Sequence, residues 1–370
     1  MDSTSNTVQR YEYVDQFRGF IGVLMLLGHC SYYLNSFWKQ LNEYDPLFPS
    51  WGQFALRYMG YICAPGFLIM AGAMIWLSFT KNTKKGSTPW QAKWHLIQRG
   101  LFLIIIQITW VNSSWGGFQS FNPWHLGIIS TIGFSMIFLT LIVSWNWQYR
   151  LSLALFILAL HPILIIINYN HSISSFSYLM ETLITSGSFN KYPVIPWFAL
   201  ALLGSVMATG WFQLWKTHSK RLIMGIGIGF IALCLAFIVR LFRGYGNILD
   251  FSSFGTYSFF LDQKYPPSLF HNLWFFGLVV LGVTLFMVLG KVFPKLLTIF
   301  SIPGKVPLFF YTIHLAILGI FIKRFDFFYR EGSIYTTLIG FIIMLAIMLP
   351  LSKWFYGIKI KSNNFFIRMI

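Results

Sequence analysis

Long apolar stretches follow one another along almost the whole chain, separated by short polar segments. A helix needs roughly 20 mostly apolar residues to cross the hydrocarbon layer of a membrane. Ten stretches meet or approach that length: 17–38, 53–79, 99–114, 124–145, 151–168, 193–213, 222–239, 267–290, 306–323 and 334–352. The pattern predicts an all-α, polytopic integral membrane protein with about ten transmembrane helices.

The composition supports this fold class. Hydrophobic residues make up 56% of the 370 residues, charged residues 10%, and the mean hydropathy is +0.64. A soluble domain usually has about 25% charged residues, and a soluble fold of this size cannot bury so much apolar surface. No small-residue cleavage site follows the first stretch, so we expect it to remain as the first span rather than leave as a signal peptide.

The basic residues lie mainly in short segments between the apolar stretches. The formal net charge is +17, but no basic helix or RNA-binding motif accompanies it, which argues against nucleic-acid binding. About twice as many Lys and Arg lie with the two termini as on the opposite side, so the positive-inside rule predicts cytoplasmic termini, by default in the cell (inner or plasma) membrane. The longer loops 39–52, 169–192 and 240–266 then face outward. We expect one transmembrane domain over 1–370, with a polar tail at 1–12 and a cytoplasmic C-terminal tail at 354–370.

The first stretch combines an ion pair with a histidine. It reads DQFRGFIGVLMLLGH, from Asp15 to His29. On a helix at 100° per residue, Asp15, Arg18 and His29 share one face, and His29 lies about 16 Å beyond Arg18. Ionisable groups inside a membrane usually face a cavity or a partner. The alternatives are an interfacial anchor at Arg18, with Asp15 as its partner or as a helix cap, and a packed histidine bonded to another helix.

A functional interpretation assigns a task to each of these groups. An anionic donor head group would bind Arg18 at the cytoplasmic mouth, and a reactive arm would extend along the helix. His29 would then act as general base at the tip of that arm.

Asp-x-x-Arg-Gly, followed after nine residues by His, resembles the first span of the heparan-alpha-glucosaminide N-acetyltransferase family, within the wider group of transmembrane acyltransferases. Three further stretches resemble that family: APGFLIMAG (64–72), KYPVIPWFALALLG (191–204) and GKVPLFFYTIH (304–314). They occur in the family's order.

The resemblance implies acyl transfer, most simply of acetyl, from cytoplasmic acyl-CoA to a sugar or glycan at the outer face. It carries over Asp15, Arg18 and His29 as the first motif, Pro193, Pro196 and Trp197 as a structural segment, and Tyr311 and His314 as the late motif. Some members have a further histidine soon after the first span; the segment CSYYLNSFWKQLNEYD contains none.

Other polar residues lie at suitable depths in the predicted spans. His161 and His314 fall near mid-membrane with His29; His161 precedes Pro162, and we expect its ring to satisfy a backbone group there. We expect the following site: His29 and His314 catalytic; Asp15, Arg18 and Arg99 binding acyl-CoA; and Trp124, His125, Trp197, His271, Asn272 and Tyr311 binding the acceptor. For the aromatic residues, an interfacial belt is the alternative.

Several kinds of site find no support in the sequence. Cys30, Cys63 and Cys234 are odd in number and widely spaced, which favours neither a disulfide framework nor a zinc site. No metal-ligand spacing and no phosphate-binding glycine loop is present. The rival function is a transporter or exporter of a small or glycan-related substrate, since ten spans with buried histidines also suit a proton-coupled carrier. A non-catalytic scaffold would leave the buried His and Arg unexplained.

Overall fold

The computed structural model describes residues 11–42, 47–169 and 177–370. The expected N-terminal tail, 1–12, therefore lies almost entirely outside the described residues. The helices are α1 Glu12–Leu34, α2 Trp51–Met59, α3 Cys63–Lys84, α4 Pro89–Ile106, α5 Asn112–Trp115, α6 Ile128–Ile142, α7 Trp147–Tyr169, α8 Ser177–Leu183, α9 Val194–Thr209, α10 His218–Leu241, α11 Tyr257–Phe260, α12 Leu269–Val292, α13 Pro294–Lys305, α14 Pro307–Leu318, α15 Ile334–Lys361 and α16 Phe365–Met369. Short 3₁₀ turns (Ser36–Lys39, Gly60–Ile62) and π-helical turns (Gln107–Val111, Gly210–Leu214, Gly319–Arg324) extend some of them.

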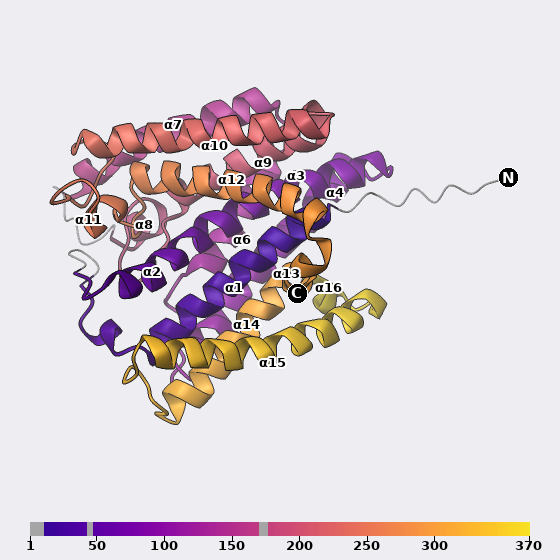
Figure 1. Cartoon of the computed structure of the whole chain (residues 1–370). Helices are drawn as coiled ribbons and strands as arrows, with labels where there is room; N and C mark the ends of the chain where they lie inside the picture. Colours follow the sequence, from indigo (N-terminus) through magenta and orange to yellow (C-terminus); the bar gives the residue numbers. More distant parts are fainter. Residues whose placement is uncertain (1–10, 43–46, 170–176) are drawn as a thin grey trace.

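The long helices run in roughly one direction through the molecule (Figure 1), with α7 and α10 along one edge of the view and α15 along the other. The short helices α2, α8 and α11 gather at one end, and α13 and α16 at the other. In the described part of the chain, nine helical segments are long and apolar enough to cross a membrane. The predicted all-α polytopic fold is confirmed.

The fourth predicted span is shorter than expected. The apolar stretch 124–145 forms α6, a helix of only 15 residues, Ile128–Ile142. Gly127 before it has an extended backbone, with φ −129° and ψ −166°, so the helix cannot begin earlier. The other nine predicted stretches each coincide with one long segment.

Helix α13 was not predicted, because 291–305 is basic and contains two prolines. Pro294 occupies the first helical turn, where a proline costs no intrahelical hydrogen bond. The helix then packs backbone to backbone on α1. A Cβ on Gly19 would lie 1.8 Å from the Phe300 carbonyl oxygen, and one on Gly304 would lie 1.8 Å from that of Asp15. This crossing needs both glycines, as close helix contacts in membranes often do.

A second crossing of the same kind joins α3 to α9. A Cβ on Gly72 would lie 1.9 Å from the Ala201 carbonyl oxygen, and one on Gly204 would lie 2.0 Å from that of Ile69. Gly72 is the last residue of the stretch APGFLIMAG, and Gly204 is the last residue of KYPVIPWFALALLG. Each of the four family-like stretches thus contributes a glycine to a close helix contact, either between α1 and α13 or between α3 and α9.

The C-terminal residues do not form the tail expected from 354. Helix α15 continues to Lys361, and α16 follows after a short break. Met369 in α16 is buried. The last residues therefore pack against the bundle instead of extending from it.

Candidate functional site

Helix α1 carries its ion pair and its histidine as the sequence predicted. Arg18 Nη1 lies 3.6 Å from Asp15 Oδ1, and the Asp15 side chain is largely buried. His29 lies further along the same helix. Arg18 lines one cavity and His29 lines the next, so the shared helix face looks into a continuous series of cavities.

His29 is paired with His314 of α14. His29 Nδ1 lies 2.7 Å from His314 Nε2, although the two residues are 285 positions apart. His314 is completely buried, and its Nδ1 lies 2.5 Å from the Phe310 carbonyl oxygen. The two predicted histidines therefore form one dyad.

The surrounding hydrogen bonds assign the protons of this dyad when both rings are neutral. A carbonyl oxygen only accepts, so His314 Nδ1 carries a proton and donates to Phe310. His314 Nε2 is then the acceptor, and His29 Nδ1 donates to it. This leaves the lone pair of His29 on Nε2, in a ring whose orientation is fixed by its partner. Such an arrangement can take a proton from a bound molecule.

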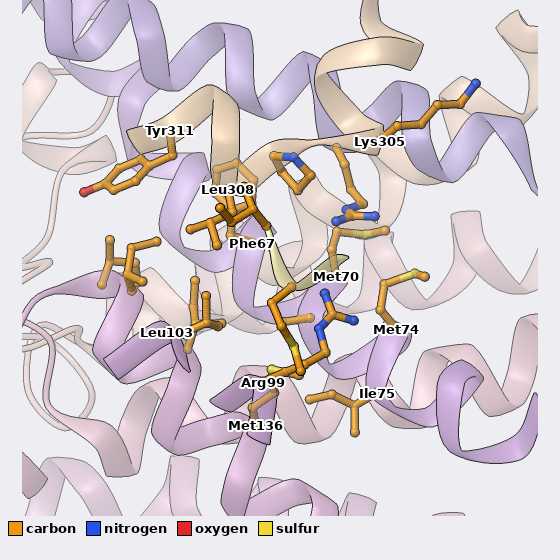
Figure 2. Close-up of a pocket in the computed structure, with 18 of the residues that line it drawn as sticks. Phe67, Met70, Met74, Ile75, Arg99, Leu103, Met136, Lys305, Leu308 and Tyr311 are labelled. Atoms are coloured by element: carbon orange, nitrogen blue, oxygen red, sulfur yellow. The ribbon is translucent and has the colours of Figure 1, made fainter. Parts of the chain in front are cut away.

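The first cavity, which we call cavity 1, has a volume of about 240 Å³ and runs along α1 from Arg18 to Met25. Its body is apolar, built from side chains of α3, α4 and α6 such as Phe67, Met70 and Leu103 (Figure 2). Four basic residues line it: Arg18, Arg99, Lys305 and Lys359. Cavity 1 thus combines an apolar channel with a cationic cluster, which suits a long molecule with an anionic head.

The second cavity, cavity 2, is larger, at about 450 Å³, and lies along α1 from Met25 to Tyr32. Polar and aromatic side chains from helix ends and loops line it, among them Trp38, Arg57, Tyr61, Gln107, Asn112, Trp115, His125, Lys191, Tyr192, Lys264, Tyr265 and Lys323. Aromatic rings and hydrogen-bonding groups together are the surfaces on which a polar, ring-shaped ligand can bind.

Cavities 1 and 2 meet beside the dyad. Met25, Phe67, Ile128 and Tyr311 line both. The centroid of the Tyr311 ring lies 5.8 Å from those of His29 and His314. A molecule in each cavity can therefore meet at His29.

A buried arginine holds the loop that forms one wall of cavity 2. Arg240, at the end of α10, donates to the carbonyl oxygens of Leu249, Ser258, Phe259 and Leu261 and to the Asn247 side chain at 2.6–3.1 Å. Its guanidinium also lies 3.5 Å from the Asp262 carboxylate, and neither side chain is exposed. Asp262 accepts hydrogen bonds from the backbone N–H groups of Ile248, Leu249 and Gln263. This network fixes the chain immediately before Lys264 and Tyr265.

A tyrosine pair ties that loop to the segment before α9. The hydroxyls of Tyr192 and Tyr265 lie 2.9 Å apart. Burial raises the pKa of Tyr192 well above its ordinary value, and the neighbouring Tyr265 adds to the effect. The Tyr192 hydroxyl therefore stays protonated and can hydrogen-bond to a ligand in cavity 2.

The structure brings some of the predicted acceptor-binding residues to cavity 2 and leaves others outside. His125 and Tyr311 line it, and His125 Nδ1 donates to the Ser188 carbonyl oxygen at 2.8 Å. Trp124 is not among the residues that line it, and it is 74% exposed. Arg99, predicted for the donor, lines cavity 1.

The structure places Trp197, His271 and Asn272, predicted for the acceptor, outside the lining of cavity 2. All three are buried at 1% exposure or less and line neither cavity. The His271 ring packs against Tyr61, Trp197 and Phe275 with centroid distances of 5.8, 5.9 and 4.7 Å. These residues pack behind the wall of cavity 2, because the first turns of α9 and α12 face the centre of the bundle. Pro193 precedes α9 and Pro196 lies in its first turn, where the missing N–H is not needed.

His161 lies apart from the dyad. Its Nε2 lies 2.9 Å from the Ile184 carbonyl oxygen and the ring is buried. The ring does bind a backbone group, though one that follows α8 and not one in its own helix. Within the described ranges, no group of three His, Cys, Asp or Glu side chains is placed to hold a metal ion.

Sequence reasoning missed several residues of cavity 2. Gln107 and Asn112 are polar, buried residues in an apolar span and hydrogen-bond to one another at 2.9 Å; their depth was a usable signal. Lys264 and Tyr265 lie in a loop, and only the fold brings them to the cavity.

Comparison with known families supplies an independent result. The family model described as heparan-alpha-glucosaminide N-acetyltransferase, catalytic, matches residues 10–234, which is more than half of the chain. A comparison with curated proteins finds no match. The matched part contains Asp15, Arg18 and His29, whereas Tyr311 and His314 follow it. The chain belongs to the heparan-alpha-glucosaminide N-acetyltransferase catalytic family and is an integral membrane protein of the acetyltransferase type.

Proposed function

We propose that the protein transfers an acyl group, acetyl in the simplest case, from acyl-CoA in cavity 1 to a sugar or glycan acceptor in cavity 2. The observation that carries the proposal is the His29–His314 dyad, 2.7 Å between ring nitrogens, at the place where the two cavities meet. In this proposal the protein lies in the cell membrane with both termini in the cytoplasm. The donor then approaches from the cytoplasm and the acceptor from outside.

The donor's chemistry matches cavity 1. Coenzyme A carries phosphates at one end and a narrow arm that ends in the thioester. Arg18 and Arg99 would bind the phosphates, and Lys305 and Lys359 line the same cavity. Asp15, 3.6 Å from Arg18, holds the guanidinium in place. The distance of about 16 Å along α1 from Arg18 to His29 is then spanned by the arm.

The dyad supplies the proton transfer. His29 Nε2 removes the proton from an acceptor hydroxyl or amine as that atom attacks the thioester carbonyl carbon. The C–S bond breaks, coenzyme A leaves as thiolate, and His29 returns the proton to its sulfur. His314 keeps the His29 ring in the tautomer that this requires. Direct transfer needs one base and proximity, without a covalent acyl-histidine.

Cavity 2 offers contacts that suit a sugar. Trp38, Trp115 and the tyrosines provide faces on which a sugar ring can stack, and His125 and Asn112 provide hydrogen-bonding groups. A lysine or arginine there, such as Lys264, can donate to sugar oxygens.

The first test needs no knowledge of the acceptor. The purified protein is melted in detergent with acetyl-CoA, coenzyme A, ATP or no ligand. A ligand that binds only the folded state adds about 2.7 kcal/mol at 100 times its Kd, so both coenzyme A forms should raise the melting temperature. Arg18→Ala should remove the increase, whereas Lys291→Ala, a basic residue that lines neither cavity, should retain it.

The opposite outcome identifies the rival function. If millimolar acetyl-CoA and coenzyme A leave the melting temperature unchanged, the proposed donor site is wrong. Substrate flux in liposomes without acyl transfer would then favour a carrier.

A further inference from the structure

In the proposed reaction, the transfer step places negative charge on the thioester oxygen. The inference about the group that stabilises this charge rests on the proposed function. When the acceptor attacks, the carbonyl π electrons move to that oxygen and the carbon becomes tetrahedral. Donors fixed at such an oxygen are often the largest single contribution to catalysis. His29 cannot serve, because its Nδ1 is held by His314 and its Nε2 receives the acceptor proton.

The junction of the cavities narrows the choice of donor. The thioester must lie there to be within reach of both His29 and the acceptor. Among the described residues that line both cavities, Met25, Phe67 and Ile128 are apolar, and Tyr311 carries a hydroxyl. Figure 2 shows Tyr311 at one end of cavity 1, its hydroxyl pointing away from Arg99 and Lys305.

The surroundings of Tyr311 leave its proton available. Tyr311 is buried, at 4% exposure, one helical turn before His314. The indole of Trp115 lies beside its hydroxyl, and an indole N–H can only donate. An N–H group cannot accept the tyrosine's proton, so the O–H of Tyr311 can donate to a bound ligand.

Other contacts hold Trp115 in position. Its ring lies 5.2 Å from that of His29 and is stacked at 5.7 Å on Tyr33. Lys323 Nζ donates to its backbone carbonyl oxygen at 2.8 Å. The indole beside Tyr311 is thus held in place before any substrate binds, and an oxyanion site requires such preorganised surroundings.

We propose that Tyr311 is a catalytic residue whose hydroxyl donates a hydrogen bond to the thioester carbonyl oxygen and stabilises the oxyanion of the tetrahedral intermediate. Tyr311 keeps its proton throughout. The C–O⁻ bond returns to C=O as the C–S bond breaks, so atoms and charge balance without a further reactant.

The test is the infrared spectrum of acetyl-CoA labelled with ¹³C at the carbonyl and bound to the purified protein. A hydrogen bond from Tyr311 weakens the C=O bond, so the bound carbonyl band should lie at lower wavenumber than in an apolar solvent and in Tyr311→Phe. The variant should still bind acetyl-CoA, with a Kd raised by no more than about tenfold for the loss of one neutral hydrogen bond, which shows that it is folded.

Tyr58→Phe is the matched control. Tyr58 is likewise a tyrosine beside an indole, since its hydroxyl accepts from the Trp274 N–H, but Tyr58 lines neither cavity. This variant should keep the shifted band of the wild type. A wild-type band at the apolar-solvent position, or a shifted band in Tyr311→Phe, would overturn the role of Tyr311 while leaving the donor site intact. Failure of acetyl-CoA to bind the wild type would instead remove the proposed function, and this inference with it.

Discussion

Cavity 1 and cavity 2 meet at His29 but are built differently. Apart from Ile370, every residue that lines cavity 1 belongs to a helix, and its body is apolar. Cavity 2 takes much of its wall from loops and helix ends, including Asn122, His125, Lys191, Lys264 and Tyr265. Helices packed through glycine crossings hold a fixed shape, whereas loops tolerate sequence change.

The difference assigns a separate requirement to each cavity. In the proposed reaction, coenzyme A calls for a channel of fixed length with charge at its mouth. The proposed acceptor would instead meet walls built partly from loops, which can change in sequence without disturbing the helices. The dyad lies where cavity 1 and cavity 2 meet. It is built by α1, which carries His29, and by α14, which carries His314, and both helices contribute to the walls of both cavities.

The largest expected effect is at the junction itself. His29→Ala removes the base without touching the cationic mouth of cavity 1, so transfer should fall by about 10²–10⁴-fold. Coenzyme A binding should be unchanged. Transfer is measured as thiol release with a panel of amino sugars, and binding by thermal shift. Normal turnover of the alanine variant would show that His29 is not the base.

The next effect separates cavity 2 from cavity 1. Arg240→Ala leaves Asp262 buried without its cation, and breaking such a pair costs about 3–5 kcal/mol of folding stability. Because the network holds the loop before Lys264, the variant should bind the acceptor more weakly, whereas its affinity for the donor should change less.

The control for this variant lies three residues along the chain. Arg243 pairs with Asp250 at 3.2 Å, but the side chains are 48% and 77% exposed, so Arg243→Ala should cost less than about 1 kcal/mol. Denaturant unfolding in detergent measures the free energy of unfolding of both variants. If Arg240→Ala and Arg243→Ala lose the same stability, the buried network does not organise the loop.

A smaller effect tests the charge of cavity 1. Arg99→Ala should weaken coenzyme A binding by about 10–100-fold, since a hydrogen bond to a charged group contributes about 1.5–3 kcal/mol. S-acetylpantetheine, which lacks the nucleotide phosphates, should bind the variant and the wild type alike. Calorimetric titration with both ligands gives the comparison. If Arg99→Ala weakens the binding of coenzyme A and of S-acetylpantetheine equally, Arg99 shapes the channel and does not bind phosphate.

The smallest effect concerns the helix crossing beside cavity 1. A Cβ on Gly304 would meet the Asp15 carbonyl oxygen at 1.8 Å, so Gly304→Ala should destabilise the protein by about 1–3 kcal/mol. Gly227→Ala, in α10 with nothing within 4 Å of the added Cβ, should instead be neutral or stabilising, by up to about 1 kcal/mol. A stable Gly304→Ala protein would mean that α13 can move away from α1.

The spans were predictable because a membrane requires a helix of known length and apolar character. The periodicity of α1 likewise predicted that Arg18 and His29 face the same series of cavities, since both lie on one rigid helix. Helix α13 was missed because its basic residues and prolines are typical of a connection, and it becomes a helix only against α1.

The direction in which the predicted acceptor-binding side chains point could not be read from the sequence. Trp197 and His271 have the chemistry of sugar-binding residues and lie at a suitable depth, yet both face the centre of the bundle. Which face of a helix looks into a cavity depends on its neighbours, and hydropathy does not report it when the helix is apolar all round. Lys264 and Tyr265 show the converse, since a loop residue has no periodicity from which to predict its direction.

The sequence by itself determined the membrane fold, the family and the residues of the first-span motif, because these depend on local length, spacing and residue type. Only the tertiary structure decided that His29 meets His314, 285 positions away, and that Tyr311 stands where the two cavities join. Contacts between distant helices depend on how every helix rotates and crosses in the bundle, and those rotations are fixed by side-chain packing and by the close approach at glycines such as Gly19 and Gly304.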